Sequence, residues 1–141
     1  MECRNGHGNH TIVVTFSNPV ISGNATVTEG TASVAGSPAF SGNTMTINLS
    51  GVTDLQKITV LLSNVTDNSS QVLPDTSVSM NVLKGDATGN KSINASDVSV
   101  VKSQVGQPVT SGNFRDDITA DGSISSSDVA LTKSGVGHGL P

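Results

Sequence analysis

Two twelve-residue stretches decide how the second half of this chain folds, and they read Asp86-Ala-Thr-Gly-Asn-Lys-Ser-Ile-Asn-Ala-Ser-Asp97 and Asp117-Ile-Thr-Ala-Asp-Gly-Ser-Ile-Ser-Ser-Ser-Asp128. A shift of 31 residues lays one stretch on the other, and 11 of the 21 positions from Asp86 to Gly106 are then identical. Identity at that level indicates an internal duplication.

Oxygen-bearing side chains stand at positions 1, 3, 5, 9 and 12 of each stretch. Calcium takes six to eight oxygen ligands at about 2.3–2.6 Å, and a loop that curls around the ion presents alternate residues to it. Position 7 would add its main-chain carbonyl, and position 12 would place a carboxylate at the start of a helix, where negative charge is favoured. The spacing therefore predicts one calcium site in each loop.

A helix is predicted after each loop, over Ser96 to Val105 and Ser127 to Val136, with Ser as a plausible N-cap and Gly106 or Gly137 as the stop. Apolar residues recur in each helix at three- and four-residue spacing, and Phe114 is expected to join them in a modest core. The predicted stripes are Val98, Val101 and Val105, and Val129, Thr132 and Val136. Ile93 and Ile124, at position 8, are expected to turn inward and to pair the two loops through a short backbone contact.

The first part of the chain alternates apolar and polar residues with a period of two, which is typical of strands that are buried on one face. The alternating sets are Ile12, Val14 and Phe16; Met45, Ile47 and Leu49; Ile58, Val60 and Leu62; and Val78, Met80 and Val82. Ala25 to Thr28 is a further strand candidate, and Thr31 to Phe40 is predicted to be irregular or an edge strand. Turns are predicted at 22–24, 41–43, 50–51 and 67–70.

Five to seven such strands predict a two-sheet sandwich, immunoglobulin-like in architecture, because two apolar faces must be buried against each other. The expected organisation is therefore mainly β over residues 10–83 and a small α module of two EF-hand-type calcium loop-helix repeats over residues 84–141. The stretch from Met1 to Asn9 is interpreted as a truncation scar.

Several classes of function lack support in this sequence. A net charge of −4 gives no basic stripe for nucleic acid, and no long apolar run predicts a membrane span. Cys3, His7 and His10 lack the fourth ligand that zinc usually needs. No catalytic set is recognisable, so an enzyme is not expected, and Asp54, Asp67, Asp75 and Glu29 are interpreted as solvated surface charges. A sugar-binding sandwich is disfavoured because Trp and Tyr are absent.

Two Asp-anchored loops, each followed by one helix and lacking an entering helix, resemble the type I dockerin repeat over Lys84 to about Val136. The preceding sandwich resembles immunoglobulin-like modules found beside dockerins in secreted bacterial proteins. The resemblance implies a non-catalytic plug that binds a cohesin module and attaches enzymes, such as those that degrade polysaccharides in cellulosome-like assemblies, to an extracellular or cell-surface scaffold.

The resemblance also implies the residues of each site. Two calcium ions would be held by Asp86, Thr88, Asn90, Ser92 and Asp97, and by Asp117, Thr119, Asp121, Ser123 and Asp128, with Asn94 and Ser125 acting directly or through water. The cohesin would be recognised by Ala95, Ser96, Lys102 and Ser103, or by Ser126, Ser127, Lys133 and Ser134. Because these two sets are alike, a partner could dock in either of two orientations. The unbound protein is expected to be monomeric.

The loops depart from the family pattern in ways that predict unequal affinity. Thr stands at position 3 in both loops, Asn90 replaces Asp at position 5, and Lys91 replaces the Gly that normally allows a sharp turn. Loop 117–128, with three carboxylates against two, is expected to bind calcium more tightly than loop 86–97. An alternative stays open, in which calcium staples a structural cap onto a secreted or surface protein that has no cohesin partner.

Overall fold

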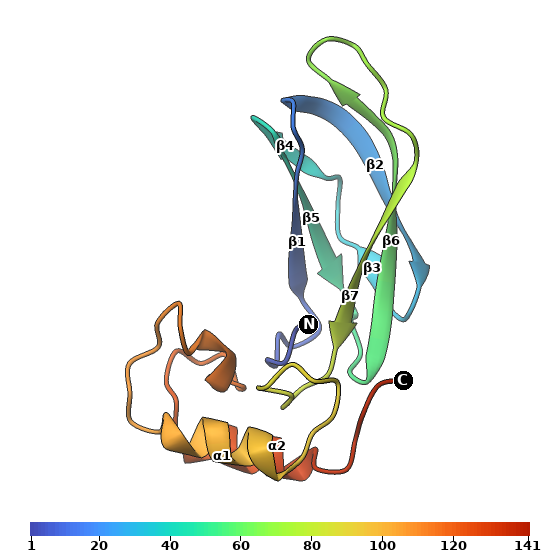
Figure 1. The fold of residues 1–141 in the computed structure, drawn as a ribbon. Helices are drawn as coiled ribbons and strands as arrows, with labels where there is room; N and C mark the ends of the chain where they lie inside the picture. The colour runs from blue at the N-terminus through green and yellow to red at the C-terminus, as the bar shows by residue number, and fades with distance from the viewer. The chain divides into compact units, whose positions relative to one another are not determined.

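A computed structural model describes residues 1–141, which form seven strands and two α-helices (Figure 1). The strands are β1 (His10–Thr15), β2 (Val20–Glu29), β3 (Ser33–Val34), β4 (Ala39–Ser41), β5 (Thr44–Ser50), β6 (Gln56–Asp67) and β7 (Thr76–Val82). The helices are α1 (Ala95–Ser103) and α2 (Ser126–Ser134), and a 3-10 turn, η1, spans Phe114–Asp116. The predicted fold class, mainly β at the N-terminal side and two short helices at the C-terminal side, is confirmed. Neither helix has the length and apolar character that crossing a membrane requires.

The chain divides into two compact units. The sheet unit consists of His7–Thr53 and Lys57–Met80, and the helical unit consists of Met1–Gly6, Asp54–Gln56 and Asn81–Pro141. The helical unit is therefore assembled from three separate stretches of sequence, the first of which lies before every strand.

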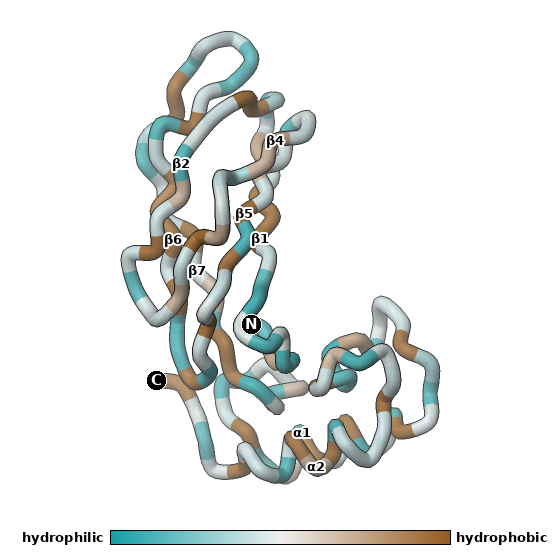
Figure 2. Tube along the Cα trace, turned by 180° about the vertical axis from the view of Figure 1, so that it is seen from behind, coloured by the Kyte–Doolittle hydropathy of each residue, from teal (hydrophilic) through white to brown (hydrophobic).

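The sheet unit contains two sheets. In one, β5 pairs antiparallel with β1, β3 and β4, and in the other β6 stands between β2 and β7 (Figure 1). The predicted alternation is seen in β5 and β6, where every second side chain over much of each strand is buried. Apolar and polar residues also alternate along the strands in Figure 2. The buried side chains are Met45, Ile47, Leu49, Ile58, Val60 and Leu62.

β2 is longer than its sequence predicts, because residues 22–24 lie within the strand and form no turn between elements. Its pairing with β6 contains register shifts on both sides of Ser22, which is how a bulged strand absorbs residues with weak strand propensity. Gly23 lies against Val65 of β6, and a Cβ built on Gly23 would stand 3.1 Å from the Val65 Cα. Glycine at position 23 therefore allows the backbones of β2 and β6 to approach closely.

Both helices begin one residue earlier than predicted, because position 9 of each loop is the N-cap. Asn94 and Ser125 accept a hydrogen bond from the backbone of the following turn, and the side chains of Asp97 and Asp128 accept from the N-cap backbone in return. These are capping boxes with Asp at the third helical position. Each helix is nine residues long and ends two residues before the predicted end.

The two loops are tied to each other's helices by main-chain pairing. Gly106, after α1, donates to the carbonyl of Ile124, and Gly137, after α2, donates to the carbonyl of Ile93, both at 2.9 Å. Matching bridges join Pro108 to Ser123 and Gly139 to Ser92. The predicted pairing of Ile93 with Ile124 is wrong, since the Ile93 backbone is taken by the segment that follows α2. Both isoleucine side chains are buried as predicted.

The core of the helical unit differs from the predicted stripes. It contains Cys3, Ala87, Val101, Ile118 and Val129, with Val98 and Leu131 packed against it. Val105 and Val136 are about half exposed. The helices end before these two positions, so helical spacing no longer directs their side chains toward the core. Phe114 is also exposed, with the Arg4 guanidinium 5.2 Å above its ring.

Candidate metal centres and docking face

The loops bury carboxylates at positions 1 and 12. Asp86, Asp97 and Asp128 are fully buried and Asp117 is 5% exposed, yet none of the four forms an ion pair. Burying a carboxylate costs free energy unless hydrogen bonds or a cation compensate for lost water. The arrangement of those hydrogen bonds defines the shape of each loop.

The carboxylate at position 1 accepts main-chain N–H bonds from the turn that follows it. Asp86 accepts from Gly89, Asn90 and Lys91 at 2.8, 3.0 and 2.8 Å. Asp117 accepts from Asp121 and Gly122 at 3.1 and 2.9 Å. The turn therefore wraps around this side chain in both loops.

The carboxylate at position 12 connects the start of the loop to the start of the helix. Asp97 accepts from the main chain of Thr88 at 3.0 Å and of Asn94 at 2.9 Å. Asp128 repeats this with Thr119 at 2.9 Å and Ser125 at 2.8 Å. Burial raises the pKa of Asp128, but these hydrogen bonds outweigh it and leave the pKa below its usual value.

The threonine at position 3 brings the two carboxylates together. Thr88 Oγ1 donates to Asp97 Oδ1 at 2.8 Å and lies 3.4 Å from Asp86 Oδ1. In the second loop the matching distances from Thr119 Oγ1 are 2.9 and 3.4 Å. Positions 1, 3 and 12 thus converge on one point in each loop, and their donor set of two carboxylates and a hydroxyl, with no cationic side chain paired to it, fits a hard cation.

The remaining predicted ligands lie at the edge of this cluster. Asn90 and Asp121, at position 5, are exposed and accept from the main chain of Ser92 and Ser123, both at 2.9 Å. Asp121 does not gather with the two buried carboxylates of its loop, and no set of three or more acidic, His or Cys side chains is close enough to hold a metal ion. The side-chain oxygens of Asn94 and Ser125 cap the helices, because they accept hydrogen bonds from the main chain of Ser96 and Ser127.

Lys91 adopts the backbone conformation that Gly122 has at the same loop position. Its φ is +68°, against +89° for Gly122. A residue with a Cβ pays a steric cost in this left-handed region. The Lys91 ammonium donates to the main-chain oxygen of Pro141 at 3.3 Å and forms no ion pair with the loop carboxylates.

All eight predicted partner-binding residues are exposed. Three of them border an apolar groove of about 420 Å³ between the two helices, which is lined by Lys102, Val105, Ser126, Val129, Ala130 and Lys133. The side chains of Ser103 and Ser134 donate to carbonyls of their own helices at 2.7 Å. The groove therefore combines an apolar floor with two lysines.

Arg115 is a site residue that the sequence analysis missed. Its guanidinium donates to the carbonyls of Asp86 and Ala87 at 3.1 Å and of Met1 at 3.3 Å. The shift of 31 residues places Lys84 at the position equivalent to Arg115, so a basic residue precedes both loops. That pattern could have drawn attention to Arg115, but spacing alone does not reveal which carbonyls Arg115 contacts.

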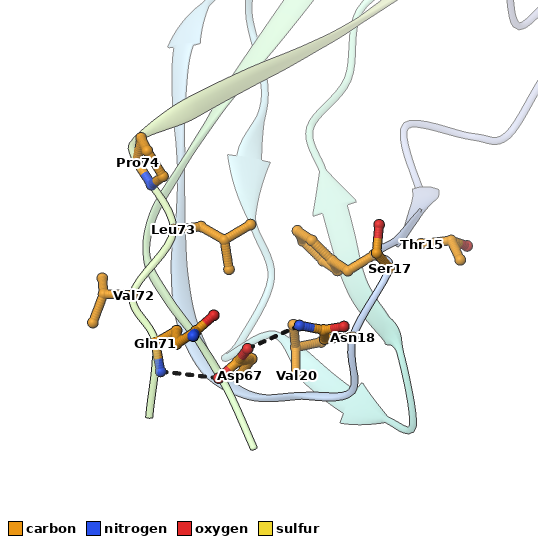
Figure 3. A pocket seen from close by; sticks show the side chains of 10 residues that line it. Thr15, Ser17, Asn18, Val20, Asp67, Gln71, Val72, Leu73 and Pro74 are labelled. Carbon is orange, nitrogen blue, oxygen red and sulfur yellow. Dashed lines mark hydrogen bonds between the residues drawn. The ribbon is translucent and has the colours of Figure 1, made fainter. Parts of the chain in front are cut away.

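A second cavity, of about 500 Å³, lies in the sheet unit (Figure 3). Its polar wall includes Asp67, which is 2% exposed rather than a solvated surface charge as predicted. The Asp67 carboxylate accepts from the main chain of Gln71 and Ser69 and from the Asn18 amide, and these bonds hold its pKa below the usual value. Asp67 therefore fixes the turn after β6.

Comparison with known families agrees with this geometry. Residues 84–136 match the family model described as Dockerin type I domain. Such domains are non-catalytic, calcium-binding protein-interaction modules, and they occur in extracellular or cell-surface proteins. Comparisons with curated proteins and with solved structures found no match to this chain.

Proposed function

We propose that residues 84–141 are a calcium-dependent docking module that binds a cohesin-type partner and so attaches an extracellular protein to a scaffold. The observation that carries the proposal is the repeated convergence of positions 1, 3 and 12, which occurs with nearly the same distances in both loops of the matched region. The role is non-catalytic, and it involves neither nucleic acid nor membrane.

Two calcium ions are proposed, one in each loop. The ligands are Asp86, Thr88, Asn90, Ser92 and Asp97 for the first, and Asp117, Thr119, Asp121, Ser123 and Asp128 for the second. Asn94 and Ser125 take part only through water, since their side chains cap the helices. The ion supplies positive charge to the buried carboxylates, and its binding free energy adds to the stability of the fold.

The second loop is the tighter of the two in this proposal. It offers Asp121 where the first offers Asn90, and ligand charge is one of the properties that set calcium affinity. The first loop also keeps Lys91 in a conformation that glycine adopts more easily.

The docking face is the exposed surface of both helices, with the groove at its centre. Lys102 and Lys133 flank apolar side chains there, so the complementary partner surface has an apolar ridge with acidic residues beside it. Ala95, Ser96 and Ser103 on α1 and Ser126, Ser127 and Ser134 on α2 extend the contact.

The experiment is calcium-dependent retention of the full chain on a panel of immobilised cohesin modules. Retention is expected in calcium and is expected to be lost in chelator. Ser126→Asp with Ser127→Asp should abolish it, because one new charge stands in the groove lining and the other on the exposed residue next to it. Ser111→Asp, on an exposed loop, should leave retention unchanged. Retention that survives the paired substitution would contradict this docking face.

The alternative is a calcium-stapled structural cap without a cohesin partner. One contact favours this alternative: the main-chain N–H of Leu140 donates to the carbonyl of Lys91 at 2.9 Å, so residues after α2 help to hold the first loop in place. Normal calcium binding together with no retention on any cohesin would support the cap.

A further inference from the structure

The first six residues, Met1–Gly6, lie in the helical unit although more than 70 residues of sheet unit separate them from its main part, Asn81–Pro141. We propose that this N-terminal segment is an intramolecular ligand of the calcium loops: it closes their shared core, and its docking is thermodynamically coupled to calcium binding. The proposal rests on the proposed calcium sites for the coupling and on separate contacts for the docking.

One edge of the segment pairs with the chain that leads into the first loop. Glu2 donates to the carbonyl of Asn81 at 2.8 Å and accepts from Leu83 at 3.0 Å, in a parallel bridge with Val82. Gly85 then donates to the carbonyl of Cys3 at 2.9 Å. This pairing ends directly before Asp86, so it positions the start of the first loop.

The other edge contacts the second loop. Asn5 donates from its main chain to the carbonyl of Ile118, which is position 2 of that loop. The Cys3 thiol lies 3.4 Å from the carbonyl of Arg115, and Arg115 in turn donates to the carbonyl of Met1. The segment therefore bridges both loops at the residues next to their first carboxylates.

The side chain of Cys3 completes the core between the loops. It is 1% exposed and packs in one cluster with Ala87 and Ile118, which hold position 2 of each loop, and with Val101 and Val129 of the helices. Undocking the segment would expose this cluster to water, and the burial of apolar surface is a main source of a fold's stability. A small unit needs that contribution.

Outside the core, charged side chains cover the segment. Arg4 forms an ion pair with Glu2 at 3.1 Å and stacks over Phe114. Arg115 joins the carbonyl of Met1 to the carbonyls of Asp86 and Ala87. Because one guanidinium holds both the segment and the start of the first loop, disturbing either one weakens the other.

Coupling follows from this shared surface. Calcium stabilises the loop conformation on which the segment docks, and by linkage the docked segment raises calcium affinity by the same factor. Cys3, the single cysteine of the chain, reports the docked state directly. Its burial also raises the pKa of the thiol to about 11, so the docked thiol is slow to react for two reasons.

The experiment measures the rate at which a disulfide reagent labels Cys3 in the full chain, with calcium and with chelator, beside a calorimetric calcium titration. Labelling in calcium is expected to be at least about tenfold slower than in chelator, because only the open state reacts. Arg115→Ala should speed labelling in calcium and weaken calcium binding, while Lys57→Ala, which removes an exposed cation of the sheet unit, should change neither.

Each outcome bears on the proposal separately from the proposed function. Calcium binding with Cys3 labelled as fast as in a free peptide of residues 1–9 would overturn docking and leave the calcium module intact. A protected Cys3 whose rate ignores calcium, or a chain that binds no calcium at all, would overturn the coupling. If Arg115→Ala does not fold, Cys3→Ser with the calorimetric titration alone should still give weaker calcium binding, and unchanged binding would count against the proposal.

Discussion

Thr88 donates its hydroxyl to Asp97 across the first loop at 2.8 Å, so a residue at the start of the loop holds the carboxylate at its end. The pair appears again as Thr119 and Asp128 at 2.9 Å. A threonine at position 3, which departs from the family pattern, therefore has a definite structural role. It orients the carboxylate at position 12 toward the one at position 1.

Asp128→Asn is expected to remove the stronger of two calcium-binding events. Its side chain is buried and lies within hydrogen-bond distance of Thr119, so the substitution takes one negative charge from the centre of the second loop. Calcium affinity of that loop should fall by at least tenfold, or about 1.4 kcal/mol. Calorimetry measures it, with Asp75→Asn, an exposed acid of the sheet unit, as the control. Two unchanged binding events would contradict the assignment.

Lys91→Gly is expected to stabilise the first loop. Lys91 has a φ of +68°, and replacing it with glycine relieves a cost of about 1 kcal/mol. Calcium should then bind this loop more tightly. Lys91→Ala is the matched control, because it removes the ammonium and keeps the Cβ. A gain from alanine as large as that from glycine would assign the effect to charge instead of backbone strain.

Asp116→Asn is expected to raise the free energy of unfolding at neutral pH. Burial raises the pKa of this carboxyl above its ordinary value of 3.8, even though Arg115 acts in the opposite direction. A raised folded-state pKa means that the carboxyl favours folding when protonated, and that this contribution is lost as pH rises through the folded-state pKa. The advantage of asparagine should therefore be present at pH 7 and absent below pH 3.8. Denaturant unfolding at both pH values without calcium tests this, and an advantage that persists at low pH would contradict it.

Gly23→Ala is expected to destabilise the sheet unit by about 1–3 kcal/mol. The new Cβ would stand 3.0 Å from Val65 Cγ2 and 3.1 Å from Val65 Cα, and backbone cannot yield easily. Gly112→Ala is the control, since the nearest atom to its Cβ is 3.7 Å away. Thermal melts of both variants measure the difference. Equal melting temperatures would mean that β2 and β6 can separate locally.

The sequence predicts the parts of this fold that repeat. Period-two alternation marks β5 and the first half of β6 because every second residue from Met45 to Leu49 and from Ile58 to Leu62 is apolar and buried. The duplication marks both loops because calcium binding requires oxygen donors at fixed spacing. The helix ends were misplaced because Asn94 and Ser125 are both plausible ligands and N-caps, and only the backbone geometry distinguishes these roles. Cys3 and Arg115 were missed because their partners are distant in sequence, and no local pattern encodes such a contact.

The crossed pairing of Gly106 with Ile124 and of Gly137 with Ile93 has a consequence for how the duplication works. Neither repeat pairs the main chain at position 8 of its own loop, since Ile93 and Ile124 each pair with the segment that follows the other repeat's helix. One repeat expressed alone would leave that edge open, and it would regain the missing partner by joining a second copy of itself. The tandem chain is in this sense a homodimer whose two subunits have been fused.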